Sequence, residues 1–285
     1  KAAFDALAKD PGTKFADAAR TGQGLVASLS GDTAAIKASY ADQLANPSAF
    51  SYNSLMMAAV TAAQTNQQKD ATKLFEAAHA VNPCHRDALY NLARLYVLDS
   101  AYGRALPVAK ELITVDPTNP DNYSLIAIAY ASIKRGYDAQ GKKLDSAAKL
   151  FGQRANAPGA RATVVKANID SAARLTPLIK AYGDSSRTAV DSAIKYNDVM
   201  SKLPARVAFS EFTATDAKTT LGGSIANLGD APKTFALKIE FLDKSCSVVT
   251  TQDVQLQALA PHATTNFTAT ATAPGIVAFR YAPIG

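Results

Sequence analysis

The chain has 285 residues, of which 48% are hydrophobic, with two cysteines and a formal net charge of +6. A chain of this length and composition can bury ample core in two domains, so it does not depend on disulfides or metals for stability. No apolar run approaches the length needed to cross a bilayer, which excludes a membrane-spanning helix within the sequence.

Residues 1–50 are expected to form a helical cap. Two Ala-rich stretches, residues 14–29 and 32–44, predict helices, and Gly31, Asp32 and Thr33 predict a turn with an N-cap between them. Asn46 and Pro47 should stop the second helix. Because these two residues echo Asn82 and Pro83 at close to one repeat length, a degenerate first repeat is an alternative interpretation.

Pro83 and Pro117 lie 34 residues apart, and the residues before them overlay position by position. The apolar positions hold Leu55, Ala58, Ala59, Ala62, Ala71, Phe75 and Ala78 in one unit, and Leu89, Leu92, Ala93, Tyr96, Ala105, Ala109 and Leu112 in the next. A third unit starts at Pro120 with Tyr123, Ile126, Ala127, Tyr130 and Ala139. Polar breaks at residues 65–70, 99–104 and 134–138 predict two helices in each unit.

This pattern resembles the tetratricopeptide repeat over residues 52–150, although Ala109 stands where an aromatic residue is usual. The resemblance implies a repeat domain at residues 51–152 that binds a protein or peptide in a concave groove. The groove positions are Asn53, Met56, Met57, Val60, Asp87, Tyr90, Asn91, Arg94, Ser124, Leu125 and Ile128. Met56 and Val60 replace residues that grip a chaperone carboxylate in one version of this groove, so we do not expect that ligand.

Residues 153–204 are expected to supply further helices that cap the array. Two helices are predicted, at residues 161–182 and 185–203, with Gly183 and Asp184 between them and Pro177 kinking or shortening the first. These helices could fill the groove themselves, so a free groove and a filled groove are both open.

The excess positive charge lies in residues 133–204, with thirteen basic and six acidic side chains. It could meet an acidic partner or an anionic surface, or form a solvated helix face. Nucleic acid is not an expected partner, because aromatic residues are few and the charges are scattered.

Residues 205–285 change to a β pattern. Strands are predicted at residues 207–213, 219–227, 234–242, 247–258, 264–271 and 276–281. Phe235, Leu237, Ile239 and Phe241 alternate, so they should share one face. These strands predict a small antiparallel sandwich, and residues 220–281 resemble the immunoglobulin-like FxLYD-type domains of bacterial envelope and secreted proteins. The predicted fold class is therefore α+β multidomain.

Residues with catalytic chemistry are sparse. The sequence has no zinc helix, phosphate loop or nucleophile elbow, so we expect no catalytic residues, no metal and no cofactor. Cys84 and His85 are adjacent in a predicted turn, where a nucleophile and a base seldom aim at one another. Cys84 and Cys246 fall in different predicted domains, and we do not expect them to pair.

Three functional interpretations follow. The first is a non-enzymatic interaction scaffold with the sandwich as an accessory module. The alternative is a carbohydrate- or envelope-binding module acting through the sandwich, and the third is an enzyme with an unrecognised site. A chain that starts at Lys1, together with the sandwich resemblance, leads us to expect that a signal peptide was removed and that the protein is periplasmic or secreted.

Overall fold

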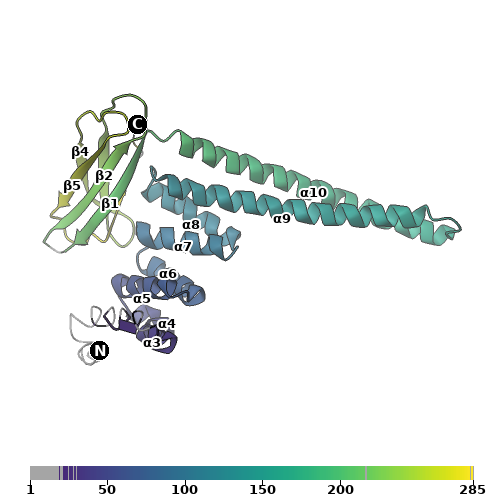
Figure 1. The fold of residues 1–285 in the computed structure, drawn as a ribbon, viewed down its shortest axis with the longest axis horizontal. Helices are drawn as coiled ribbons and strands as arrows, with labels where there is room; N and C mark the ends of the chain where they lie inside the picture. The colour runs from purple at the N-terminus through teal and green to yellow at the C-terminus, as the bar shows by residue number, and fades with distance from the viewer. Residues whose placement is uncertain are drawn as a thin grey trace. The chain divides into compact units, whose positions relative to one another are not determined.

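A computed structural model describes residues 19, 22–24, 26, 27, 29, 31–215, 217–282 and 284 (Figure 1). Much of the helix predicted at residues 14–29 lies outside the described residues. The chain forms two compact units, one comprising Lys1–Asn122 with Leu203–Gly285 and the other Tyr123–Lys202. The second unit is therefore an insertion, because the chain leaves the first unit after Asn122 and returns to it at Leu203.

The helix predicted at residues 32–44 is divided in the structure. It forms α3 (Thr33–Ser39) and α4 (Ala41–Ala45), followed by the short 3-10 helix η1 (Pro47–Ala49). Asp32 caps α3 as predicted, accepting hydrogen bonds from the backbone N–H groups of Ala34 and Ala35. The division falls at Tyr40, whose side chain is buried and whose hydroxyl lies 3.2 Å from Asp70 Oδ2.

The helix pairs predicted for the first two repeats are confirmed. They are α5 (Tyr52–Gln64) with α6 (Gln68–Val81), and α7 (Arg86–Leu98) with α8 (Tyr102–Val115). Corresponding helices begin 34 residues apart. The turn within each pair also repeats, because Asn66 and Ser100 both adopt a positive φ, of 62° and 58°. This domain is therefore built of tetratricopeptide-like helical hairpins.

Small residues allow the repeat helices to approach closely. Ala59, Ala62, Ala71 and Ala78 have no exposed surface, and they pack in one core with Leu55 and Phe75. Across the repeats, Glu76 accepts hydrogen bonds from Tyr96 at 2.9 Å and from Arg104 at 2.6 Å. These contacts join α6 to both helices of the next repeat.

The predicted third helix pair is wrong. Residues 120–155 form one continuous helix, α9 (Pro120–Ala155), and the supposed break at residues 134–138 lies inside it. Lys134 and Asp138 form an ion pair four residues apart, so the polar residues support the helix. No residue there adopts the positive φ that Asn66 and Ser100 provide in the earlier turns.

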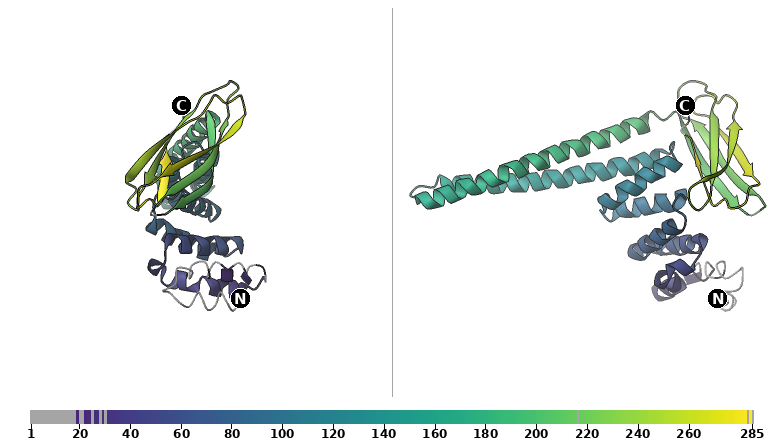
Figure 2. Two further views of the ribbon diagram at one scale, coloured as in Figure 1. Left: turned by 90° about the vertical axis from the view of Figure 1, so that its left-hand side faces the viewer. Right: turned by 180° about the vertical axis from the view of Figure 1, so that it is seen from behind.

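The predicted break at Gly183 and Asp184 is wrong for the same reason. Residues 162–201 form a single helix, α10 (Ala162–Ser201), which Pro177 does not shorten, and Asp184 pairs with Lys180 within it. The two helices run side by side as an antiparallel hairpin (Figures 1 and 2). Contacts along the pair include Ser186 Oγ with Asp138 Oδ1 at 2.5 Å and the rings of Tyr130 and Tyr196 at 6.1 Å.

Two three-stranded antiparallel sheets follow, and their strands agree with the six predicted. Their order is β1-β2-β5 and β4-β3-β6. The strands are β1 (Ala205–Ala214), β2 (Thr219–Asn227), β3 (Ala236–Leu242), β4 (Val248–Gln255), β5 (Thr264–Ala271) and β6 (Ala278–Tyr281). Leu237, Ile239 and Phe241 enter a single hydrophobic core with residues of the other sheet. The α+β character of the chain is thereby confirmed.

One glycine in β2 has a packing role. A Cβ atom on Gly223 would lie 2.5 Å from the carbonyl oxygen of Ala208 and 2.8 Å from the ring of Phe267. These neighbours belong to β1 and β5, the strands on either side of β2. Glycine at this position therefore leaves the room that the Phe267 ring occupies against β2.

Candidate functional site

The predicted groove residues of α5 and α7 have different environments. Asn53, Asp87 and Arg94 are exposed, and Met57 is 41% exposed. Met56 and Val60 are partly buried and pack against the repeat core. Tyr90 and Asn91 are half-buried, and the amide of Asn91 donates to the carbonyl of Asp87 at 2.8 Å.

The remaining predicted groove residues lie on α9 and belong to the inserted unit. There Leu125 is buried, Ser124 is half-buried and Ile128 is 46% exposed. Within the first unit, Asn53 and Asp87 are one repeat apart and both exposed, whereas the repeat equivalents of Met57 and Arg94, which are Asn91 and Val60, are half-buried.

The loops that follow each of the two repeats bind the C-terminal sheets through equivalent positions. Asn82 and Asp116, 34 residues apart, are both buried, and each follows the second helix of its repeat. Asn82 Nδ2 donates to the carbonyl of Val277 at 2.9 Å, while the hydroxyl of Tyr281 donates to Asp116 Oδ1 at 2.6 Å. We call this contact between residues 82–86, 116–121 and the sheets the loop interface.

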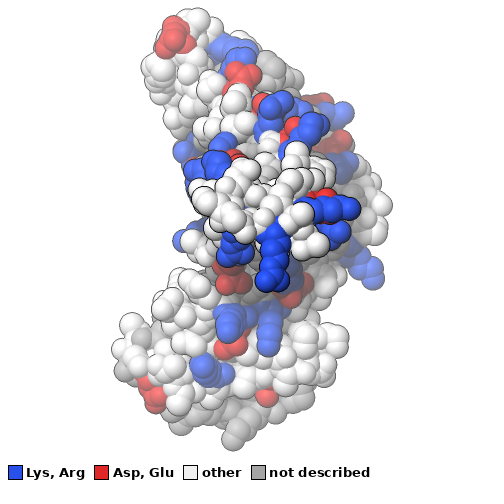
Figure 3. Space-filling view, turned by 90° about the vertical axis from the view of Figure 1, so that its right-hand side faces the viewer, with Lys and Arg blue, Asp and Glu red and all other residues white. Residues whose placement is uncertain are grey.

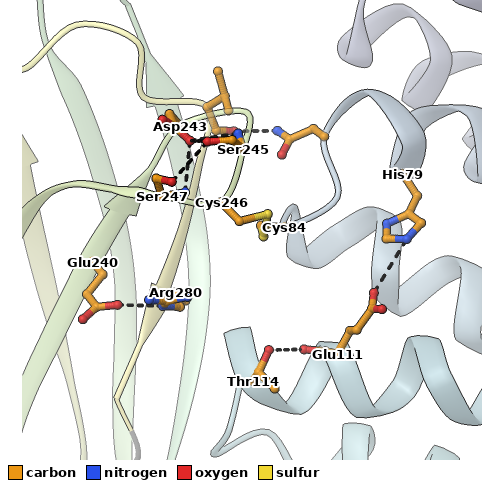
Figure 4. The surroundings of a disulfide bond; sticks show 12 residues. His79, Cys84, Glu111, Thr114, Glu240, Asp243, Ser245, Cys246, Ser247 and Arg280 are labelled. Carbon is orange, nitrogen blue, oxygen red and sulfur yellow. Dashed lines mark hydrogen bonds and ion pairs between the residues drawn. A yellow bond between two sulfur atoms is a disulfide. The ribbon is translucent and has the colours of Figure 1, made fainter.

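The expectation that Cys84 and Cys246 do not pair is wrong, because they form a disulfide across the loop interface (Figure 4). Cys84 lies in the first connecting loop. Cys246 lies in the β3–β4 turn, where its φ of 65° falls in the left-handed region that usually favours glycine. The two Cα atoms are 5.7 Å apart across a sequence separation of 162 residues. Only the fold brings the two turns together, and no spacing motif in the sequence could have indicated it.

Asp116 is the centre of a buried polar network. Its side chain receives the hydroxyl of Tyr281 and the amide of Asn119, and Arg86 Nε lies 3.4 Å from its Oδ2. Burial, followed by the charge of Asp116, raises the pKa of the Tyr281 phenol, which therefore stays protonated as a donor. Thr118 extends the network, accepting the N–H of Val207 in β1 at 3.3 Å.

Two small cavities open between α7 and β1. The larger, of about 220 Å³, is lined by Arg86, Tyr90, Asn119, Asp121, Arg206 and residues 207–209. The smaller, of about 130 Å³, is lined by His85, Arg86, Asp87, residues 209–212 and Phe279. Arg86 stacks over the ring of Phe209 and so contributes to both cavities. Two predicted groove residues, Asp87 and Tyr90, thus border cavities whose other wall is β1.

His85 has a structural position beside these cavities. Its ring packs 4.4 Å from Tyr52, and its Nδ1 accepts the N–H of Asp87 as the N-cap of α7. Burial lowers the pKa of His85, and Arg86 adds to that effect against the opposing charge of Asp87. The neighbouring Cys84 is held in the disulfide, so no free thiol stands beside this imidazole.

The described part of the chain holds no cluster of three or more His, Cys, Asp or Glu side chains placed to bind a metal ion. Among the helices described, none is both long and apolar enough to cross a membrane.

No protein-family model and no curated protein matches the chain. Among solved structures, it is similar to a tetratricopeptide repeat protein from Parabacteroides merdae, with 15% identity, 70% of this chain and 89% of that chain covered, and a TM-score of 0.38. A structure of MamA MSR-1 is 16% identical over 66% of this chain and 99% of its own, with a TM-score of 0.33. The alkylpurine DNA glycosylase AlkC of Pseudomonas fluorescens is 11% identical over 95% of this chain and 88% of its own, with a TM-score of 0.20. At these values the similarities carry no argument about function.

Proposed function

We propose that this protein is a non-enzymatic interaction scaffold whose α5 and α7 bind a peptide segment of a partner protein. The observation that carries the proposal is that matching positions on the two first helices, Asn53 and Asp87, are exposed while the connecting loops are occupied by the sheets. In this proposal the partner is bound by the part of the predicted repeat domain that lies in the first unit, residues 51–122.

The exposed side chains indicate what kind of peptide would bind. Met57 offers a flexible apolar contact, and Asp87 and Arg94 offer one charge of each sign. Tyr90 borders the larger cavity, where a peptide side chain could contact its ring. These features favour a mixed apolar and charged segment over one recognised by its carboxylate end.

The C-terminal domain has an accessory role in this proposal, as a sandwich of the immunoglobulin-like type that holds the repeats in register. The disulfide supports an oxidising compartment, so we propose a periplasmic or secreted location. The rings of Phe209 and Phe212 each pack against that of Phe279 in a tilted arrangement beside the loop interface, with centroids 4.6 and 5.1 Å away. These rings are engaged in packing, which does not favour the carbohydrate-binding alternative.

A random-peptide phage library selected on the full chain would test the groove. Peptides enriched on the wild type should bind Met57→Glu and Tyr90→Ala at least about tenfold more weakly, because hot-spot contacts are lost. Val81→Glu is the matched control, since Val81 is also 41% exposed but lies on a second helix. Equal loss in the control, or full binding by Met57→Glu and Tyr90→Ala, would contradict the groove proposal.

A further inference from the structure

The inserted hairpin carries the positive charge of the protein. Residues 123–202 hold thirteen Lys and Arg against six Asp, an excess of seven, whereas the whole chain has a net charge of +6. The rest of the chain is therefore close to neutral. Figure 3 looks along the hairpin from its tip and shows Lys and Arg around an uncharged end.

Most of the acidic side chains on the hairpin are already neutralised. Asp138, Asp145, Asp184 and Asp198 each pair with a lysine four residues away on the same helix. Several cations have no such partner. Lys143, Arg154 and Arg174 are exposed and make no ion pair or hydrogen bond with any residue that the structure describes.

The row of buried residues between the two helices, which we call the seam, determines which of these cations share a face. Partly or fully buried residues recur at alternating steps of three and four, the spacing of a coiled coil. They are Tyr137, Gly141, Leu144, Ala148, Phe151 and Ala155 on α9, and Val165, Asn168, Ala172, Leu175, Ile179 and Tyr182 on α10. A Cβ on Gly141 would lie 3.7 Å from that of Tyr182, which places these residues opposite each other.

One flank of this seam combines exposed aliphatic residues with the unpaired cations. The register set by Gly141 with Tyr182 and by Asp138 with Ser186 places Leu178 of α10 across the seam from Ala147 of α9. Val164 lies two heptads before Leu178, and Arg154 lies one heptad after Ala147, so both stay on this flank. Leu150, Lys143 and Arg174 adjoin these positions by steps of one helical turn. We call the set the distal patch, which comprises Lys143, Leu150, Arg154, Val164, Arg174 and Leu178. Its three aliphatic side chains are 46 to 49% exposed, and none of its positions is acidic.

We propose that the distal patch docks the hairpin on an anionic lipid surface. The cations would meet lipid phosphate groups while Leu150, Val164 and Leu178 enter the boundary with the acyl chains. A second copy of the same patch is disfavoured, because its unpaired cations would repel one another. Duplex nucleic acid would use the cations but leave the exposed leucines and valine in water.

Flotation of the full chain with lipid vesicles tests the proposal. Binding is expected to phosphatidylcholine vesicles that contain phosphatidylglycerol and not to phosphatidylcholine alone. Lys143→Glu with Arg174→Glu should weaken that binding about tenfold or more, since each juxtamembrane cation contributes to the attraction. Leu150→Gln with Leu178→Gln should also weaken it, which a purely electrostatic contact would not require.

The opposite flank of the hairpin provides matched controls. Lys142→Glu with Lys166→Glu makes the same charge change at exposed positions outside the patch, and Ile194→Gln removes an aliphatic side chain that is 60% exposed. These variants should keep vesicle binding within about twofold, with circular dichroism confirming helix content. Equal loss in patch and control variants would overturn the proposal, as would no vesicle binding at all. Patch-dependent binding of duplex DNA or an acidic peptide without vesicle binding would overturn it as well.

Discussion

The repeat helices and the inserted hairpin share an Ala-rich composition, yet they differ in how the chain turns. α5 to α8 are 13 or 14 residues long, whereas α9 and α10 have 36 and 40 residues. The repeats turn at Asn66 and Ser100, which adopt a left-handed φ. One repeat later the equivalent residue is Lys134, which pairs with Asp138, and the helix continues. A cluster of polar residues ends a helix only when one of them accepts the turn conformation.

The two regions also differ in how far apart in the sequence their contacting residues lie. The repeats and the sheets are joined by contacts between distant residues, including Cys84 with Cys246 and Asp116 with Tyr281. The hairpin is held by the seam between its two helices and by ion pairs between residues four positions apart on the same helix. Damage to the loop interface should therefore spread through the first unit, while damage in the hairpin should stay local.

Among the substitutions that test this difference, removal of the disulfide should cause the largest loss of stability. Cys84→Ala with Cys246→Ala should lower the free energy of unfolding of the first unit by about 4 kcal/mol, because it frees a long loop in the unfolded chain. Chemical denaturation followed by tyrosine fluorescence and far-ultraviolet circular dichroism would measure it. An unchanged unfolding midpoint would show that the polar network alone holds the loop interface.

Asp116 offers the next largest effect. Asp116→Ala removes the buried carboxylate that accepts the hydrogen bond of Tyr281 and pairs with Arg86, and should cost about 3 kcal/mol in the same denaturation measurement. Asp121→Ala is the control, since Asp121 is exposed and its ion pair with Arg206 should contribute less than about 1 kcal/mol. Similar losses in both variants would contradict a special role for the buried network.

Acid should weaken the loop interface through His85. Because the pKa of His85 is lowered in the folded protein, its contribution to stability is complete above the unfolded value of 6.5 and is lost as pH falls through the folded pKa. Protonation removes the acceptor that caps α7, a loss of roughly 1 kcal/mol. Thermal unfolding from pH 7.5 to 5 should show this slope in the wild type and a smaller one in His85→Asn, which can still cap. Identical slopes would place the pH dependence elsewhere.

Local rules predicted most of the fold. The 34-residue period located α5 to α8, and alternation with turn residues located all six strands, because these elements bury regular faces. The same rules failed at residues 134–138 and at Gly183. The polar residues there resemble a helix break in the sequence, but charged residues four positions apart form ion pairs that stabilise the helix. The loop interface could not be predicted, since Asn82, Asp116 and Cys84 acquire partners only when the sheets arrive from more than 160 residues away.

The smallest expected change in stability is that of Gly183→Ala, and its sign distinguishes a continuous helix from a break at this residue. Gly183 has no positive φ, and a Cβ there would meet nothing within 4 Å, so Gly183→Ala should stabilise the hairpin by about 0.5 to 1 kcal/mol. At the hairpin tip Gly159 has a φ of 76°, and Gly159→Ala should destabilise it because alanine resists that conformation. Thermal melts followed at 222 nm compare the two variants. If Gly183→Ala also lowered the melting temperature, the chain would turn at this glycine, and α10 would be two shorter helices as the sequence pattern first indicated.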